Sequence, residues 1–131
     1  MSEGGCFCGA VRYRVTGSPL SSAICHCESC RRASGAPSVA WVTVERKGFE
    51  IVKGTPAAYP SSPGVTRRFC GRCGSALTYE NTKTPESIDI TTITLDEPNR
   101  FPPTVEVWLE DRVDWQPISP SLKQFPGGSS S

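Results

Sequence analysis

Seven cysteines, gathered in three short clusters, constrain this 131-residue chain more than any other feature of its sequence. Cysteines one or two residues apart have the spacing of metal ligands, whereas disulfide frameworks usually spread their cysteines between elements. An odd number of cysteines also cannot pair completely into disulfides. We therefore predict metal binding, with redox thiols and disulfides as the alternatives, for three groups: Cys6 and Cys8, then Cys25, Cys27 and Cys30, then Cys70 and Cys73.

The first and last of these clusters have the features of two half-sites for one metal ion. Each is followed directly by a glycine, Gly9 or Gly74. A glycine there allows a positive φ, which turns backbone N–H groups toward the sulfur atoms. Four thiolates are a typical ligand set of structural zinc, and harder cations disfavour sulfur. We predict one structural zinc ion, with two unrelated pairs of buried thiols as the alternative, at Cys6, Cys8, Cys70 and Cys73.

The middle cluster offers only three sulfur ligands, at Cys25, Cys27 and Cys30. In an extended stretch Cys25 and Cys27 point the same way and His26 points the opposite way, so His26 is a poor fourth ligand. Three protein ligands and one exchangeable position are typical of catalytic zinc. We predict a second zinc ion here, in a site that need not be fully occupied. A Cys3His structural site and a thiol cluster that binds metal only weakly remain open as alternatives.

Arginines flank the cysteine clusters and offer partners for negative charge. Arg31 and Arg32 follow Cys30 directly, and Arg67 and Arg68 precede Cys70. Guanidinium groups offset thiolate charge and bind carboxylates in a bidentate manner. We predict that Arg31 and Arg32 contact the substrate, with solvated surface charges as the alternative.

The open position indicates thiol chemistry. Zinc with three thiolate ligands is suited to bind a further thiol and to hold it as a thiolate near neutral pH. A thiolate beside an electrophilic carbonyl leads to formation of a carbon–sulfur bond. A Ser-His-Asp arrangement is excluded, because the one histidine of the chain lies inside the cysteine cluster.

Short segments with strand periodicity predict an all-β fold. Apolar–polar alternation or β-branched runs indicate strands at 11–15, 38–44, 49–52, 66–69, 76–80, 87–94 and 104–109. We expect 38–52 to form one hairpin and the strands around Cys70–Cys73 to form another. Segment 55–66, which holds three prolines and two serines, is expected to be a loop.

Helices are expected to be few and short, and the chain to form one domain. Only 27–34 and 95–100 fit a short helix, and Pro98 disfavours the second. The length is enough for one core. We predict a single domain over residues 1–126 and a flexible tail over 127–131.

Composition and charge exclude several classes of partner. No apolar run approaches the ~20 residues of a membrane span, and the first residues lack a signal-peptide pattern. We therefore expect a cytoplasmic protein without a membrane partner. Lys and Arg number 14 against 13 Asp and Glu, a balance that argues against nucleic acid as the partner. Exposed strand edges are compatible with a homodimer.

The three cysteine blocks, in this order, closely resemble one known family. Residues 5–11, 25–31 and 69–77 are similar to the glutathione-dependent formaldehyde-activating enzymes, a family that includes centromere protein V. The resemblance extends over roughly residues 3–126. It implies a zinc-bearing β-tent of packed antiparallel sheets with few short helices.

The resemblance also implies roles and a reaction. Cys6, Cys8, Cys70 and Cys73 match the structural zinc ligands, and Cys25, Cys27 and Cys30 match the catalytic zinc ligands. The implied activity is that of a carbon–sulfur lyase, which adds glutathione to formaldehyde or a related small aldehyde to give an S-(hydroxymethyl)glutathione-type product. Two other hypotheses stay open: a zinc-stabilised module that binds a protein or nucleic acid, and a thiol sensor without catalysis.

One position departs from the expected pattern. The late strand carries Glu106, where a histidine is half expected in some members of the family. Alternation in Val105-Glu106-Val107 predicts that the Glu106 side chain faces outward, away from the core.

Overall fold

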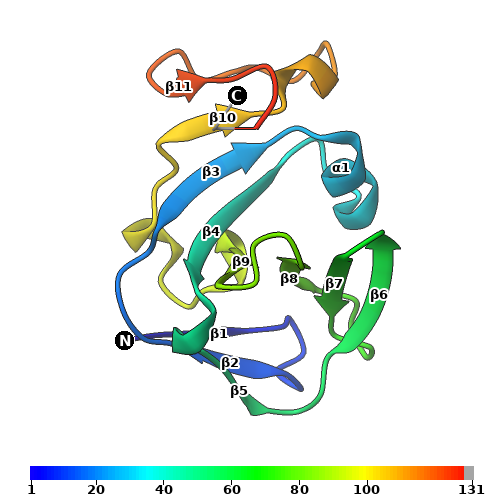
Figure 1. Ribbon diagram of the computed structural model, residues 1–131, viewed down its shortest axis with the longest axis vertical. Coiled ribbons are helices and arrows are strands. Elements are labelled where there is room, and N and C mark those ends of the chain that lie inside the picture. The colour runs from blue at the N-terminus through cyan, green and yellow to red at the C-terminus, as the bar shows by residue number, and fades with distance from the viewer. Residues whose placement is uncertain (129–131) are drawn as a thin grey trace.

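The computed structural model describes residues 1–128 and folds them mainly into two β-sheets (Figure 1). The small sheet has the antiparallel order β1 (Ser2–Gly5), β2 (Arg12–Val15) and β5 (Phe49–Lys53). The large sheet has the order β11 (Lys123–Gln124), β10 (Val105–Val107), β3 (Ser21–Cys25), β4 (Val39–Glu45), β9 (Ser87–Thr91), β8 (Ala76–Asn81), β7 (Val65–Phe69) and β6 (Ala57–Ser62). This architecture confirms the predicted all-β class.

Helical structure within residues 1–128 is limited to short pieces, as predicted. The one α-helix, α1, spans Glu28–Ser34 and ends at Gly35, whose φ of 68° is left-handed. The remaining pieces are single 3-10 turns: η1 (Arg46–Gly48), η2 (Thr92–Thr94), η3 (Pro98–Arg100) and η4 (Leu109–Asp111). Pro98 opens η3, where its missing N–H costs nothing, and no α-helix forms over 95–100.

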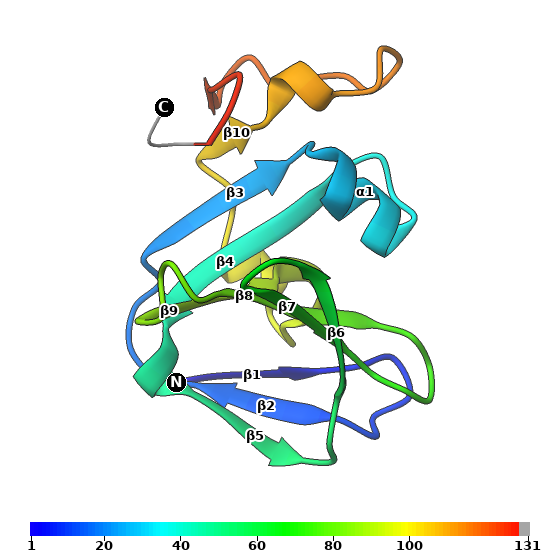
Figure 2. The same cartoon turned by 45° about the vertical axis from the view of Figure 1, so that its right-hand side comes forward.

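The main core lies between the two sheets. Figure 2 shows the small sheet beneath the β6–β9 part of the large one. Alternation places Tyr13 and Val15 of β2 inward, opposite Val42 of β4 and Ile88 and Ile90 of β9. The opposite face of β4 and β9 is thereby left to line a cavity, described below.

The expected hairpin over 38–52 is wrong. Strand β4 pairs with β3 and β9, whereas β5 crosses to the small sheet and pairs with β2. The chain passes through η1, where the Gly48 carbonyl accepts a hydrogen bond from the Thr16 N–H at 2.8 Å. A Cβ at position 48 would lie 2.5 Å from the Thr16 carbonyl oxygen. The glycine therefore permits a close approach to β2 instead of a turn back along β4.

The expected loop over 55–66 is also wrong, because β6 occupies most of it. This strand is the edge of the large sheet, so Pro60 removes no ladder hydrogen bond on the outer side. The pairing with β7 shifts register between Tyr59 and Ser62, which places the proline at an irregularity. Proline at an edge or bulge is the known exception to its exclusion from strands.

The last strands depart from a purely antiparallel arrangement. Strand β10 runs parallel to both β3 and β11. Parallel neighbours need a long connection, and nearly 80 residues separate β3 from β10 in the chain. The strands at 87–94 and 104–109 end earlier than predicted, since η2 and η4 replace their last residues.

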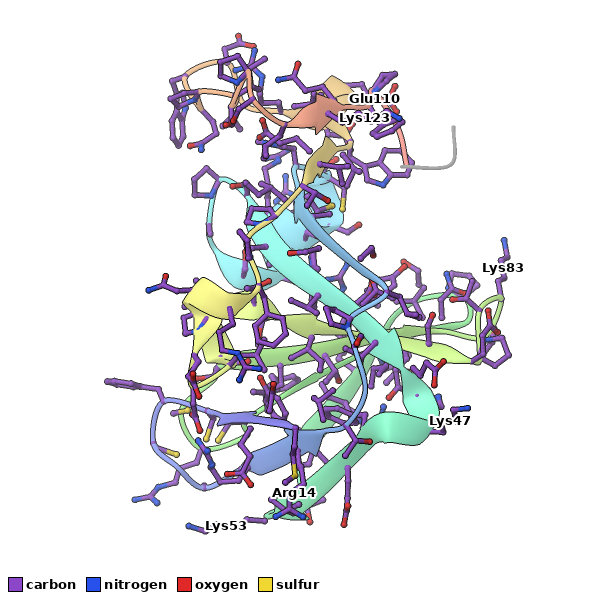
Figure 3. All side chains as sticks on the ribbon, turned by 90° about the vertical axis from the view of Figure 1, so that its left-hand side faces the viewer. Arg14, Lys47, Lys53, Lys83, Glu110 and Lys123 are labelled. Carbon is purple, nitrogen blue, oxygen red and sulfur yellow. The ribbon has the colours of Figure 1, made fainter. Side chains whose placement is uncertain are left out.

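Charged side chains lie at both ends of the molecule. In Figure 3, Arg14 and Lys53 extend from the small sheet, and Glu110 and Lys123 mark the opposite end.

The start of the expected tail is attached to the fold: the Gly127 carbonyl accepts a hydrogen bond from the Trp108 N–H at 2.9 Å. Ser129–Ser131 of that tail lie outside the described residues. No helix within residues 1–128 is long and apolar enough to cross a membrane.

Candidate metal centres and active site

Two hairpin turns bring four cysteines together at one side of the core. Cys6 and Cys8 lie between β1 and β2, and Cys70 and Cys73 lie between β7 and β8. All four sulfur atoms lie within 4.8 Å of one another. The Cys8 sulfur is 3.7 Å from that of Cys6 and 3.8 Å from that of Cys70. Four convergent sulfurs form a complete tetrahedral donor set for zinc.

Glycines shape both turns, as the sequence predicted. Gly9 and Gly74 have φ values of 80° and 82°. The N–H of Val11 donates to the Cys6 sulfur at 3.2 Å. The N–H groups of residues 72 and 73 both donate to the Cys70 sulfur at 3.4 Å. These donors favour thiolates, which are the form that binds a metal.

The three remaining cysteines converge where β3 meets α1. Cys25 ends β3, Cys27 is the N-cap of α1, and Cys30 lies in its first turn. Their sulfur atoms lie within 4.8 Å of one another, with Cys25 and Cys30 buried. The N–H of Cys30 donates to the Cys27 sulfur at 3.3 Å. Because β3 and β4 on either side of α1 are antiparallel, this Cys-x-x-Cys is not part of a βαβ unit.

His26 points away from these sulfurs, as predicted. Its side chain is fully buried, and Nε2 lies 2.8 Å from Oε1 of Glu106. The three-sulfur cluster therefore gains no fourth donor from His26.

In the three-sulfur cluster the pKa of the Cys27 thiol is lowered, and the pKa values of the Cys25 and Cys30 thiols are raised. Hydrogen bonds from Cys25 and Cys30, with a smaller contribution from Arg67, lower the pKa of the Cys27 thiol to about 2. The same interactions and burial raise the pKa of Cys25 well above its usual range. Arg67 places its guanidinium nitrogens 3.7 and 3.8 Å from the Cys30 sulfur, and it also lies 5.0 Å above the Tyr79 ring. The positively charged Arg67 side chain therefore lies next to the thiol of Cys30.

A cavity of about 550 Å³ opens beside this cluster. Cys25, Cys27 and Cys30 lie at one end of it. Its floor is the outer face of the large sheet, where strand register aligns one residue from each of five neighbouring strands: Ser21, Thr43, Asp89, Tyr79 and Arg67. Trp41 adds an apolar wall. Such a concave site with few polar groups is typical of small-molecule binding.

Arg31 and Arg32 do not line this cavity. Arg31 donates from Nε to the carbonyl oxygen of His26 at 3.3 Å. Arg32 pairs with Glu28 at 2.9 Å and is 79% exposed. Their contact with a substrate stays a prediction, and the arginine that does line the cavity is Arg67. The sequence predicted a strand that contains Arg67. It could not predict the contact with Cys30, because the two residues are 37 positions apart in the chain.

The expectation that Glu106 faces outward is wrong. Its side chain is only 2% exposed. Oε1 contacts His26, and Oε2 accepts a hydrogen bond from the Ser119 N–H at 2.6 Å. The alternation argument failed because the segment that follows β10 returns over it: the Phe125 N–H donates to the Glu106 carbonyl. Glu106 thus joins the loop of the three-cysteine cluster to the C-terminal segment.

Replacing Glu106 by alanine is expected to lower the free energy of unfolding by about 3 kcal/mol. The change leaves His26 Nε2 and the Ser119 N–H without their shared acceptor, at roughly 1–3 kcal/mol for each buried group. Denaturant unfolding of the two proteins measures the difference. Glu110→Ala is the matched control, since Glu110 is exposed (Figure 3) and should change stability by less than about 0.5 kcal/mol. Equal midpoints for Glu106→Ala and the unmodified protein would contradict this role.

The fold and its thiol clusters define a small β protein with two candidate metal centres, and comparison with known proteins identifies its family. The family model for the glutathione-dependent formaldehyde-activating enzyme matches residues 1–111. The chain belongs to this family, which confirms the resemblance seen in the cysteine blocks.

Individual relatives agree with this assignment. A Halomonas elongata protein with the provisional name of glutathione-dependent formaldehyde-activating enzyme is 33% identical over 126 residues, covering 88% of this chain and 80% of that protein. A Schizosaccharomyces pombe protein, described as an uncharacterized lyase, is 28% identical over 131 residues. The match covers 94% of this chain and 89% of that protein. A crystal structure of a Rhodobacter sphaeroides protein has the same fold, with a TM-score of 0.62 at 23% identity, covering 72% of this chain and 87% of that one.

Proposed function

We propose that the protein is a zinc-dependent carbon–sulfur lyase that joins glutathione to formaldehyde or a related small aldehyde. The observation that carries the proposal is the convergence of Cys25, Cys27 and Cys30 at the end of a cavity, with three sulfur donors where the other cluster has four. Family membership and the names of the relatives support glutathione and formaldehyde as the substrates.

The residues of the three-sulfur cluster fit a zinc ion. Zinc prefers sulfur donors, which harder cations disfavour, and the lowered pKa of Cys27 favours the thiolate form that a metal binds. A zinc ion bound there would supply a position for the substrate thiol and favour its thiolate form near neutral pH. Cys25, Cys27 and Cys30 would be its protein ligands, and Cys6, Cys8, Cys70 and Cys73 would bind the structural ion.

The protein's own groups would orient and stabilise the reactants. Arg67 offers a guanidinium beside Cys30, where it offsets the negative charge of the sulfurs or binds a substrate carboxylate. Trp41 and Tyr79 provide apolar surface that limits water around the reacting carbonyl. In the reaction, the glutathione thiol would lose its proton as its S–H bond breaks, and its sulfur would form a bond to the aldehyde carbon. The C=O π electrons would move to oxygen, which would take up the proton that the thiol released. The sum of the reactants equals the adduct, so no oxidant or reductant is needed.

The proposal predicts two zinc ions per chain, one of which responds to glutathione. Metal analysis of protein purified without chelator, repeated with glutathione present, tests this prediction. The ion at the three-sulfur cluster should become exchangeable because a competing thiol reaches it through the cavity, whereas the four-sulfur site is complete. Adduct formation should exceed the uncatalysed rate, which is measured in parallel without protein. One tightly held ion that glutathione leaves unchanged would instead favour a binding or sensing role.

A further inference from the structure

Asp89 is the acidic residue at the centre of β9, between the apolar side chains of Ile88 and Ile90. Its neighbours on β9, Ile88 and Ile90, face the core, so Asp89 faces the cavity on the opposite side of the sheet. The Thr43 hydroxyl donates to its Oδ1 at 2.6 Å. Aspartate is disfavoured in strands, and Asp89 contributes nothing to the apolar core. Its position indicates a role in the cavity.

The Asp89 carboxylate has no cationic partner in the described part of the chain. Within residues 1–128, no Lys, Arg or His nitrogen lies within 4.0 Å of it. Burial raises the pKa of this carboxyl, against a smaller opposing effect of the Thr43 hydrogen bond. A desolvated carboxylate is stabilised when a cation pairs with it.

The other acidic groups of the cavity already have partners. Glu28 pairs with Arg32 at 2.9 Å. Asp111 accepts a hydrogen bond from the Glu28 N–H at 3.2 Å. Asp111 has no cationic partner among the described residues either, but its bond to the N–H that follows Cys27 places it beside the cysteine cluster, too near the sulfurs for a remote ligand group. Asp89 is therefore the carboxylate of the cavity wall best placed to bind a cationic group at the far end of a ligand.

We propose that Asp89 binds the ammonium group of the γ-glutamyl arm of glutathione, and thereby selects thiols with a cation remote from the sulfur. This inference rests on the proposed function, because it places the substrate sulfur at the three-cysteine cluster. Thr43 fixes the carboxylate through its hydrogen bond, and Trp41 and Tyr79 line the space between the two ends of the ligand.

The spacing within the sheet matches a ligand of this length. Cys25 lies four residues along β3 from Ser21, whose neighbours across the sheet are Thr43 and then Asp89. Four residues along a strand and two strand spacings place the Cα atoms of Cys25 and Asp89 roughly 16 Å apart. The sulfur and ammonium nitrogen of glutathione are about eight bonds apart, or roughly 10 Å when extended. The two side chains and their contacts with the ligand cover the remainder, a span for which a two-carbon aminothiol is too short.

The test compares two ligands that differ only in the ammonium group. Calorimetric titration of the zinc-loaded protein uses glutathione and its deaminated analogue, glutaryl-cysteinyl-glycine. The analogue should bind the unmodified protein about tenfold or more weakly, because a hydrogen-bonded charge pair is lost. Asp89→Asn should weaken glutathione binding by a similar factor and leave binding of the analogue nearly unchanged. Asp114→Asn, an exposed matched control, should preserve the preference for glutathione.

Each outcome separates this inference from the function beneath it. Equal affinity of the unmodified protein for both ligands would overturn the ammonium site and leave the proposed function standing. An equal loss for both ligands in Asp89→Asn would show that Asp89 acts on the fold alone. If neither ligand binds the zinc-loaded protein, the proposed function fails and the ammonium site fails with it. The comparison of the two ligands on the unmodified protein stands even if Asp89→Asn folds poorly.

Discussion

Replacing Cys70 by alanine is expected to unfold the protein, not merely to remove a ligand from a surface site. Cys70 is 1% exposed and belongs to the main core. The proposed zinc ion at its cluster joins the β1–β2 turn to the β7–β8 turn. Structural zinc contributes roughly 10–16 kcal/mol in zinc-finger peptides, which matches or exceeds the entire stability of about 5–15 kcal/mol of a typical domain. Far-UV circular dichroism and metal analysis of Cys70→Ala should show loss of the β signal together with zinc.

The matched control for Cys70→Ala is the removal of a thiol from the other cluster. Cys30→Ala also removes a buried sulfur, but its cluster lies at the end of a cavity and does not join the two turns. It should retain the fold and one zinc ion. A strong chelator added to the unmodified protein should reproduce the unfolding of Cys70→Ala. A Cys70→Ala protein that still unfolds cooperatively, within about 2 kcal/mol of the unmodified protein, would contradict a structural role for this site.

The sequence predicted the two thiol clusters because their geometry is local. Each half-site is a turn of a few residues, and the positive φ of Gly9 and Gly74 follows from the spacing of the cysteines. His26 pointed away from the sulfurs for the same reason, since side chains alternate along an extended segment. That the two half-sites bind one ion was inferred from the four ligands that structural zinc needs. The sulfur atoms of Cys6 and Cys70 do lie within 4.8 Å of each other.

The features that the sequence did not predict depend on segments far apart in the chain. Alternation places Glu106 opposite Val107, but burial of that face depends on residues 119–125 returning over β10. The same holds for Asp89: alternation shows that it faces away from Ile88, but only the position of α1 and β7 makes that face a cavity. An acidic residue between two isoleucines of a strand was the available signal for it.

Replacing Cys27 by serine is expected to abolish glutathione binding and activity while the fold is retained. Cys27 is the N-cap of α1 and its sulfur accepts the Cys30 N–H. Serine is among the preferred N-cap residues, so its hydroxyl replaces this contact and stability should change by less than about 1 kcal/mol. Serine does not provide the low-pKa thiolate, so the cluster keeps only two of its three sulfur donors. Affinity for glutathione should fall at least about a hundredfold, since even outer-shell changes cost 10–100-fold in metal sites.

The four-cysteine cluster serves as the internal control for Cys27→Ser. Metal analysis should find one zinc ion per chain in place of two, and the thermal unfolding curve should stay close to that of the unmodified protein. Adduct formation should then equal the rate without protein. If Cys27→Ser loses one zinc ion but binds glutathione as before, the thiol does not bind at this cluster. If it keeps both ions, Cys25 and Cys30 suffice for the second metal and the three-donor site is wrong. The serine variant changes a single atom, from sulfur to oxygen. Because oxygen preserves the helix cap and only sulfur supplies a thiolate ligand, the variant distinguishes effects on metal and substrate binding from effects on folding.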